Sequence, residues 1–203
     1  IDTWIIWNLT NKKKHLTDIT NASRTMLYNI ADEVWDHEIL DLFNISESIL
    51  PTVQSNKDDF GTIHSDHFGI EIPIGGVIGD QQSASLGQLC VKKGMIKATY
   101  GTGCFVLINT DENKTKSKNK LLTTIASKVD DKKQYAVEGS IFNAGTVVQW
   151  LRDEMKLFKD VSEIESLIQN SKNDITFIPA FTGLGAPYWK SDTRGTIYGI
   201  TRD

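Results

Sequence analysis

Two short segments of the sequence combine the residue types that phosphoryl-transfer chemistry requires. Asp80 follows the apolar residues 77–78 and Gly79, and it precedes a segment rich in small residues. A carboxylate at the carboxyl end of a strand lies where α/β sheets bind ligands, and it can accept the proton of a substrate hydroxyl. Further along, Gly101-Thr102-Gly103 separates two apolar runs. Glycines there would let a phosphate approach backbone N–H groups, and the threonine hydroxyl would add one hydrogen bond.

Each of these segments also has a purely structural explanation. An aspartate before a helix commonly caps it, and for Asp80 judged by spacing alone this is the more frequent role. Two glycines between apolar runs suit any tight hairpin, because glycine tolerates a positive φ. Neither segment alone therefore identifies a catalytic site.

Three further residues are candidates for ligand contacts. Gln81 offers both a donor and an acceptor, which suits it to orient a polyol. Gly145 lies in the first turn of a helix expected over residues 143–158, where free N–H groups and the helix dipole favour an anion or a nucleotide. Gln149 follows one turn later on the same side. The structural alternative is a small residue for close packing and an exposed glutamine.

The hydrophobic pattern around these residues predicts a mixed α/β chain. Capping residues and helical spacing predict helices over residues 2–9, 36–43, 81–88, 143–158 and 161–169, a turn and helical start within 15–30, and a helical turn capped by Ser46. Apolar or alternating runs predict strands over residues 95–100, 104–109, 122–127, 134–138 and 175–179. Residues 53–75 are expected to form a loop or short hairpin, and residues 77–80 the end of a buried strand.

The composition excludes several classes of function. The chain has 203 residues, a net charge of −4 and no recurrent lysine or arginine stripe, so a nucleic-acid surface is not expected. Its apolar stretches are too short to cross a bilayer, and no signal peptide is recognisable, so we expect a cytoplasmic protein without a membrane span. The first and last residues interrupt apolar segments, which suggests a piece of a longer protein.

Five segments, in order along the chain, resemble the FGGY carbohydrate kinases, and among them the members that phosphorylate glycerol. The segments are Thr20–Leu27, Gly79–Gln82, Thr99–Phe105, Gln149–Met155 and Pro179–Trp189. The resemblance implies an RNase H-like α/β fold of the actin/hexokinase ATPase type, present in part. Residues 1–87 would end the first, substrate domain, and residues 88–203 would begin the second, nucleotide domain. The β-β-β-α order over residues 95–158 fits such a domain, in which phosphates lie at the first hairpin turn.

The resemblance also implies a role for each candidate residue. Asp80 would be the catalytic base and a glycerol ligand, and Gln81 a second glycerol ligand. The ATP-binding positions would be Gly101, Thr102, Gly103, Gly145 and Gln149. The longer protein would transfer phosphate from ATP, with Mg²⁺, to glycerol, giving glycerol 3-phosphate, and we expect it to form a homo-oligomer.

Several parts of the family's site have no counterpart in this sequence. They are the first phosphate loop with its aspartate for Mg²⁺, most of the glycerol pocket and the adenosine loop. No metal ligand is therefore assigned within the chain, and negligible turnover is expected from these residues alone, since phosphoryl transfer depends on positioning and charge neutralisation. Two alternatives stay open: another FGGY kinase acting on a pentulose or related polyol, and a non-catalytic structural or interaction module.

A regulatory difference is also expected from the sequence. Some bacterial members of this branch are inhibited by fructose 1,6-bisphosphate, which a glycine-containing loop and an arginine hold in the region matching residues 65–71. Glu71 stands where that arginine would lie. A carboxylate repels a bisphosphate, so we expect this inhibition to be absent. The alternative is that the loop has drifted and that Glu71 is an ordinary solvated side chain.

Overall fold

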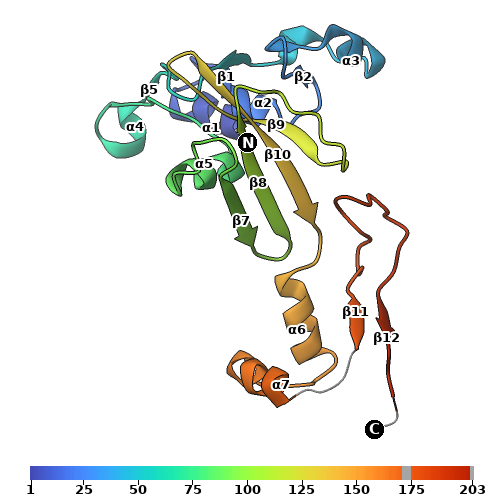
Figure 1. The fold of residues 1–203 in the computed structure, drawn as a ribbon. Coiled ribbons are helices and arrows are strands. Elements are labelled where there is room, and N and C mark those ends of the chain that lie inside the picture. The colour runs from blue at the N-terminus through green and yellow to red at the C-terminus, as the bar shows by residue number, and fades with distance from the viewer. Residues whose placement is uncertain (171–174, 202–203) are drawn as a thin grey trace. The chain divides into compact units, whose positions relative to one another are not determined.

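The computed structural model describes residues 1–170 and 175–201 of the chain (Figure 1). The chain forms two compact units, each of which combines segments that are distant in sequence. The first unit contains residues 1–97, 107–117 and 122–138, and the second contains residues 98–106, 118–121 and 139–203.

Short helices and strands make up most of the first unit. In chain order they are α1 (Asp2–Leu9), β1 (Leu16–Asp18), α2 (Ile19–Ala22), β2 (Tyr28–Asn29), β3 (Val34–Trp35), α3 (His37–Leu42), the 3₁₀ helix η1 (Glu47–Ile49), β4 (Thr52–Gln54), β5 (Thr62–Ile63), α4 (Ser65–Phe68), β6 (Ile72–Pro73), α5 (Asp80–Gly87) and β9 (Leu122–Val129). The helices predicted over residues 2–9, 36–43 and 81–88 are confirmed to within a residue at each end. The hairpin expected within residues 53–75 is the antiparallel pair β5–β6.

A four-stranded sheet with the order β7-β8-β10-β9 contains all four strands predicted between residues 95 and 138. Its remaining strands are β7 (Ile96–Tyr100), β8 (Cys104–Asp111) and β10 (Lys132–Ile141). Strands β9 and β10 pair antiparallel, from Lys132 opposite Val129 to Glu138 opposite Leu122. The two-stranded pairs β1–β4, which is parallel, and β2–β3, which is antiparallel, complete the strand pairing of the first unit.

The main apolar core of the first unit joins α2, α3 and the β2–β3 hairpin to strands β9 and β10. Its buried members are Ile19, Ala22, Tyr28, Trp35, Leu40, Ile125 and Tyr135. The rings of Tyr28 and Trp35 meet edge to face with their centroids 5.3 Å apart, an arrangement that aromatic pairs favour. Helix α2 packs against β9, so the core ties the segment before residue 23 to the sheet.

The second unit contains the helices and strands that follow the sheet. They are α6 (Gly145–Asp153), the 3₁₀ turn η2 (Val161–Glu163), α7 (Ile164–Asn170), β11 (Thr176–Ile178) and β12 (Thr196–Tyr198). The helix expected over residues 161–169 is thus a 3₁₀ turn continued by an α-helix, and Asp160 caps it with Glu163 in a capping box. Strand β12, which pairs antiparallel with β11, was not predicted from the sequence.

The helical turn after Ser46 is η1, but the Ser46 side chain makes no capping hydrogen bond. Two element predictions near the candidate residues are wrong. Residues 74–79, all described, run as irregular backbone, so Asp80 does not end a strand. The reason is that the peptide groups of Val77 and Gly79 bond to Asn56 and to the Thr20 hydroxyl instead of to a neighbouring strand. The helix expected over residues 143–158 stops at Asp153, since the chain turns at Lys156, whose φ is 55°.

None of the helices in the part of the chain that the structure describes combines the length and the apolar character of a membrane span.

Candidate active site

Asp80 is the first residue of α5, and its side chain is exposed. The helix cap is Gly79, so the structural alternative in which Asp80 caps the helix is not observed. One carboxylate oxygen, Oδ1, accepts a hydrogen bond from the Gln81 N–H at 2.7 Å. A carboxylate in the first turn is stabilised by the positive end of the helix dipole. Asp80 is therefore placed to meet a ligand from solvent.

The backbone immediately before Asp80 is buried and closely packed. Gly79 is buried, and its N–H donates to Thr20 Oγ1 at 2.9 Å. A Cβ atom added at Gly79 would lie 2.8 Å from Gln82 Oε1, which is closer than side chains tolerate. Gln82 in turn donates from Nε2 to the Ile125 carbonyl oxygen in β9 at 3.3 Å. The start of α5 is thus attached to α2 and to β9.

Gln81 is oriented by a buried lysine. Lys97 is only 1% exposed, and its Nζ donates to Gln81 Oε1 at 2.5 Å. With its oxygen bonded to Lys97, the carboxamide directs its nitrogen the other way. That nitrogen is a donor suited to the oxygen of a substrate hydroxyl.

The glycine turn in the second unit packs against the start of α6. The Gly101 N–H donates to the Gly103 carbonyl oxygen at 2.8 Å, which closes the turn. The Gly101 carbonyl oxygen accepts from the Gly145 N–H at 2.8 Å. A Cβ atom at Gly145 would lie 2.6 Å from that same oxygen, and one at Gly103 would lie 2.5 Å from the Ile141 oxygen. Only glycine fits at both positions, which explains the sequence pattern.

The expectation of free N–H groups at the start of α6 is wrong for its first positions. The N–H groups of Ala144 and Gly145 donate to the carbonyl oxygens of Thr102 and Gly101, each at 2.8 Å. The Thr146 hydroxyl also donates to the Thr102 oxygen, at 3.1 Å. These bonds rigidly join the turn to the helix, so Gly145 acts on the turn and not through a free N–H. Thr102 and Gln149 both have exposed side chains, available to a ligand.

The candidate residues thus fall into two groups, one in each compact unit. Asp80 and Gln81 adjoin at the start of α5 in the first unit. In the second unit the turn of residues 101–103 contacts Gly145, and Gln149 follows on the same helix. Sequence reasoning missed Asp18, Thr20 and Asn56, whose polar atoms support the Asp80 segment. Thr20 lies in a segment that carries the family resemblance, whereas nothing local distinguishes Asn56.

The described side chains at this site do not supply a complete set of metal ligands. Within residues 1–170 and 175–201, no group of three or more His, Cys, Asp or Glu side chains could hold a metal ion. Mg²⁺ is bound in phosphoryl-transfer sites by one or two carboxylates together with phosphate oxygens and water. The described residues fit that requirement only through the exposed carboxylate of Asp80, and they form no metal centre by themselves.

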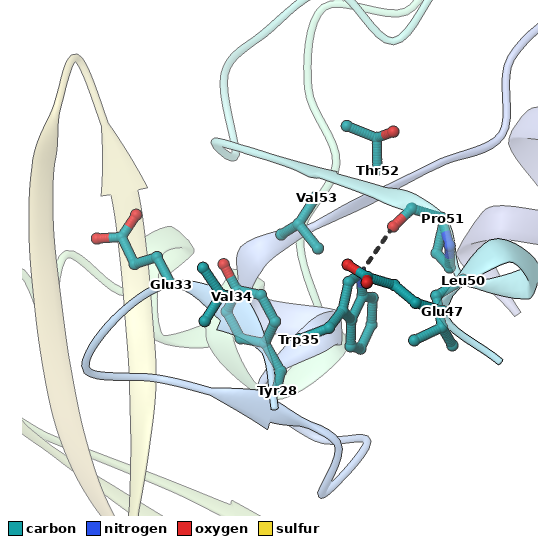
Figure 2. Close-up of a pocket in the computed structure, with 9 residues that line it drawn as sticks. All are labelled: Tyr28, Glu33, Val34, Trp35, Glu47, Leu50, Pro51, Thr52 and Val53. Carbon is teal, nitrogen blue, oxygen red and sulfur yellow. Dashed lines mark hydrogen bonds between the residues drawn. The ribbon is translucent and has the colours of Figure 1, made fainter. Parts of the chain in front are cut away.

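A separate pocket of about 320 Å³ lies beside the β2–β3 hairpin and contains none of the candidate residues (Figure 2). Trp35 Nε1 donates to the Pro51 carbonyl oxygen across it at 3.1 Å. At its edge, Glu33 pairs with Lys128 at 2.5 Å and Lys133 at 2.7 Å. Burial opposes the ionisation of Glu33, yet the hydrogen bonds from both lysines outweigh it and hold its pKa below the usual value. Because Glu33 and the two lysines pair with one another, we interpret them as structural and not as ligand contacts.

Comparison with solved structures defines the class of fold. The chain superposes on the glycerol kinase of Plasmodium falciparum with ADP with a TM-score of 0.89 and 46% identity, covering 100% of this chain and 41% of that one. It also superposes on a ligand-bound xylulose kinase from Lactobacillus acidophilus with a TM-score of 0.83 and 24% identity, covering 98% and 41%. These are sugar kinases with the actin/hexokinase-like ATPase fold, so the predicted fold class is confirmed.

The chain belongs to the FGGY family of carbohydrate kinases. The family's N-terminal domain matches residues 1–87, and its C-terminal domain matches residues 96–203. The chain is also 53% identical over 203 residues to the glycerol kinase of Chromobacterium violaceum, covering 99% of this chain and 41% of that protein. It spans about two fifths of the length of the curated relatives it matches.

Proposed function

We propose that the full-length protein carrying this chain transfers the γ-phosphoryl group of ATP to glycerol, giving sn-glycerol 3-phosphate and ADP. The observation that supports this most is the likeness to the ADP-bound glycerol kinase, which extends over the whole chain at 46% identity. The exposed carboxylate at the start of α5 agrees with it, because a phosphoryl acceptor needs a base within reach.

The proposed mechanism gives each candidate residue one task. Asp80 accepts the proton of a glycerol hydroxyl while that oxygen attacks the γ-phosphorus, and the bond from that phosphorus to the β–γ bridging oxygen breaks, releasing ADP. The Gln81 carboxamide orients the polyol. Thr102 approaches the γ-phosphate, Gly101 and Gly103 shape that turn, Gly145 holds it against α6, and Gln149 offers an exposed side chain to the nucleotide.

Mg²⁺, when bound, would neutralise phosphate charge. Its ligands are expected mainly in other parts of the protein, since the described candidate residues include a single carboxylate, Asp80, which serves as the base.

We further propose a domain division, a homo-oligomeric assembly and a cytoplasmic location for the full-length protein. Residues 1–87 would belong to the substrate domain and residues 88–203 to the nucleotide domain, and a homo-oligomer in the cytoplasm is part of the same proposal. A protein of these 203 residues alone is expected to catalyse negligible phosphoryl transfer. One carboxylate and one phosphate-binding turn are not enough to position the reacting groups and neutralise their charge.

Coupled measurement of ADP release tests the proposed function. The full-length protein is expected to release ADP with glycerol and Mg·ATP and to discriminate strongly against xylulose. Faster turnover of xylulose or another pentulose would instead support the alternative of a different FGGY kinase. Absence of ADP release with every polyol, from protein shown to be folded, would favour a non-catalytic module and contradict the proposal.

We expect no tight binding of fructose 1,6-bisphosphate. Glu71 is exposed and lies at a pocket of about 330 Å³ together with Asp59, Lys13 and Lys14. The two carboxylates balance the two lysines, so this pocket has no net positive charge from these four groups to attract a bisphosphate. Calorimetric titration of the full-length protein is expected to give no heat of binding at micromolar bisphosphate, and Glu71→Arg to strengthen binding. Tight binding by the unaltered protein would contradict this expectation.

A further inference from the structure

A buried cluster of three polar side chains, Asp18, Thr20 and Asn56, lies beneath the segment that leads into α5. Asp18 and Thr20 are completely buried, and Asn56 is 6% exposed. Buried polar groups are costly unless their hydrogen bonds are satisfied. Each of the three side chains therefore requires hydrogen-bond partners within the fold.

Asp18 is the acceptor at its centre. Its carboxylate accepts from the Thr20 N–H at 2.7 Å, from the Thr20 hydroxyl, and from Asn56 Nδ2 at 2.7 Å. Asn21 adds bonds from its Nδ2 at 2.5 Å and its N–H at 3.4 Å. Burial raises the pKa of the Asp18 carboxyl, although these hydrogen bonds partly offset the loss of water. Asp18 thereby fixes both Thr20 and Asn56.

Asn56 joins two distant segments through pairs of bonds. Its Nδ2 donates to the Val77 carbonyl oxygen at 2.9 Å, and its own carbonyl oxygen accepts from the Val77 N–H at 3.0 Å. Its Oδ1 accepts from the Lys128 N–H at 2.7 Å, and its N–H donates to the Lys128 oxygen at 2.9 Å. Asn56 therefore holds Val77 against the end of β9, as a neighbouring strand would have done.

Thr20 holds the next point along the chain. Its Oγ1 donates to Asp18 and accepts from the Gly79 N–H at 2.9 Å. One residue separates the two held positions, Val77 and Gly79, and Asp80 follows directly. Since residues 74–79 lie outside any helix or strand, these bonds take the place of a sheet ladder in fixing where α5 begins.

We propose that Thr20, supported by Asp18 and Asn56, is a positioning residue for Asp80. It acts through the Gly79 peptide group and touches no substrate. The inference rests on the proposed function of Asp80 as the base. A displacement of about 1 Å at a reacting group can cost roughly 100-fold in rate, so loss of the Gly79 bond should act on the chemical step.

A matched pair of variants of the full-length protein tests this. Thr20→Val keeps the side-chain shape but removes the oxygen, while Thr20→Ser keeps the oxygen and removes only a methyl group. Thr20→Val is expected to lower kcat for glycerol phosphorylation about 10- to 100-fold with KM for ATP nearly unchanged. Thr20→Ser is expected to stay within about threefold of the unaltered protein, since it retains the Gly79 acceptor.

Amide hydrogen exchange of residues 74–82 supplies a readout independent of activity. Faster exchange there in Thr20→Val than in Thr20→Ser, with residues 122–129 unchanged, would support the positioning role. Equal kcat in both variants, or equal exchange, would overturn it. If Thr20→Val does not fold, Thr20→Ala replaces it, because alanine also removes the oxygen but puts no second methyl group beside the buried Asp18 carboxylate. If the unaltered protein does not phosphorylate glycerol, the proposed function fails, whereas the exchange comparison still decides whether Thr20 holds this segment.

Discussion

Replacing Asp80 by asparagine is expected to lower kcat for glycerol phosphorylation by roughly 10²- to 10⁴-fold, the range typical of a lost general base. Asparagine has the same shape and keeps an oxygen that can accept from the Gln81 N–H, which the Asp80 Oδ1 accepts at 2.7 Å. Because the side chain is exposed at the first turn of α5, the fold should change little. The measurement is steady-state ADP release together with the thermal unfolding midpoint.

A carboxylate in an equivalent local setting provides the control. Glu38 is also exposed and lies in the first turn of a short helix, α3. Glu38→Gln removes one negative charge from a helix start without touching the proposed site, so kcat should stay within about twofold. An Asp80→Asn protein that retains most of its kcat would show that the base is another group, and the mechanism proposed for this chain would be wrong.

Replacing Gly145 by alanine is expected to impair nucleotide use strongly. The added Cβ would lie 2.6 Å from the Gly101 carbonyl oxygen, and this neighbour is backbone that cannot swing aside. The turn of residues 101–103 must then move away from α6 and lose the bond from the Gly145 N–H. Overpacking of this kind costs about 1–3 kcal/mol. We expect KM for ATP to rise about tenfold or more and the unfolding midpoint to fall.

Gly87 offers the matched control for this substitution. It ends α5, and a Cβ atom added there would meet nothing within 4 Å. Gly87→Ala should therefore leave KM for ATP unchanged and slightly raise stability, because alanine loses less conformational entropy than glycine. Normal KM for ATP and normal stability in Gly145→Ala would mean that the contact between the turn and α6 has no role in nucleotide binding.

Local sequence patterns predicted much of the fold. They suffice for a helix, whose hydrogen bonds lie within the element, and for a strand in which apolar and polar residues alternate regularly. The helix over residues 2–9 and the four strands between residues 95 and 138 are examples, and both are confirmed. The longest expected helix was overextended, because apolar spacing continues past Asp153 although the backbone turns at Lys156. Strand β12 was not predicted, because its definition depends on pairing with β11.

At the candidate site, the residue types and their order were readable from the chain, including the exposed aspartate at a helix start and the glycines of the turn. Their supporting partners were not. The sequence placed Asp80 at the end of a strand, whereas the structure holds it after irregular backbone bonded to Thr20 and Asn56. These bonds join residues 20 or more positions apart. Hydrogen bonds between such distant residues produce no periodic pattern in the sequence from which they could be predicted.

The sequence by itself therefore determined most of the helices, the strands of the four-stranded sheet, the family resemblance and the reactive groups, since each depends on neighbouring residues or on their order. Only the tertiary structure decided how those groups are held. It showed that the N–H groups of Ala144 and Gly145 at the start of α6 donate to carbonyl oxygens of the glycine turn, and that Gln81 Oε1 accepts a hydrogen bond from Lys97. The physical reason is that a polar atom's partner is chosen by proximity in the folded chain, and that proximity arises only when distant segments pack together.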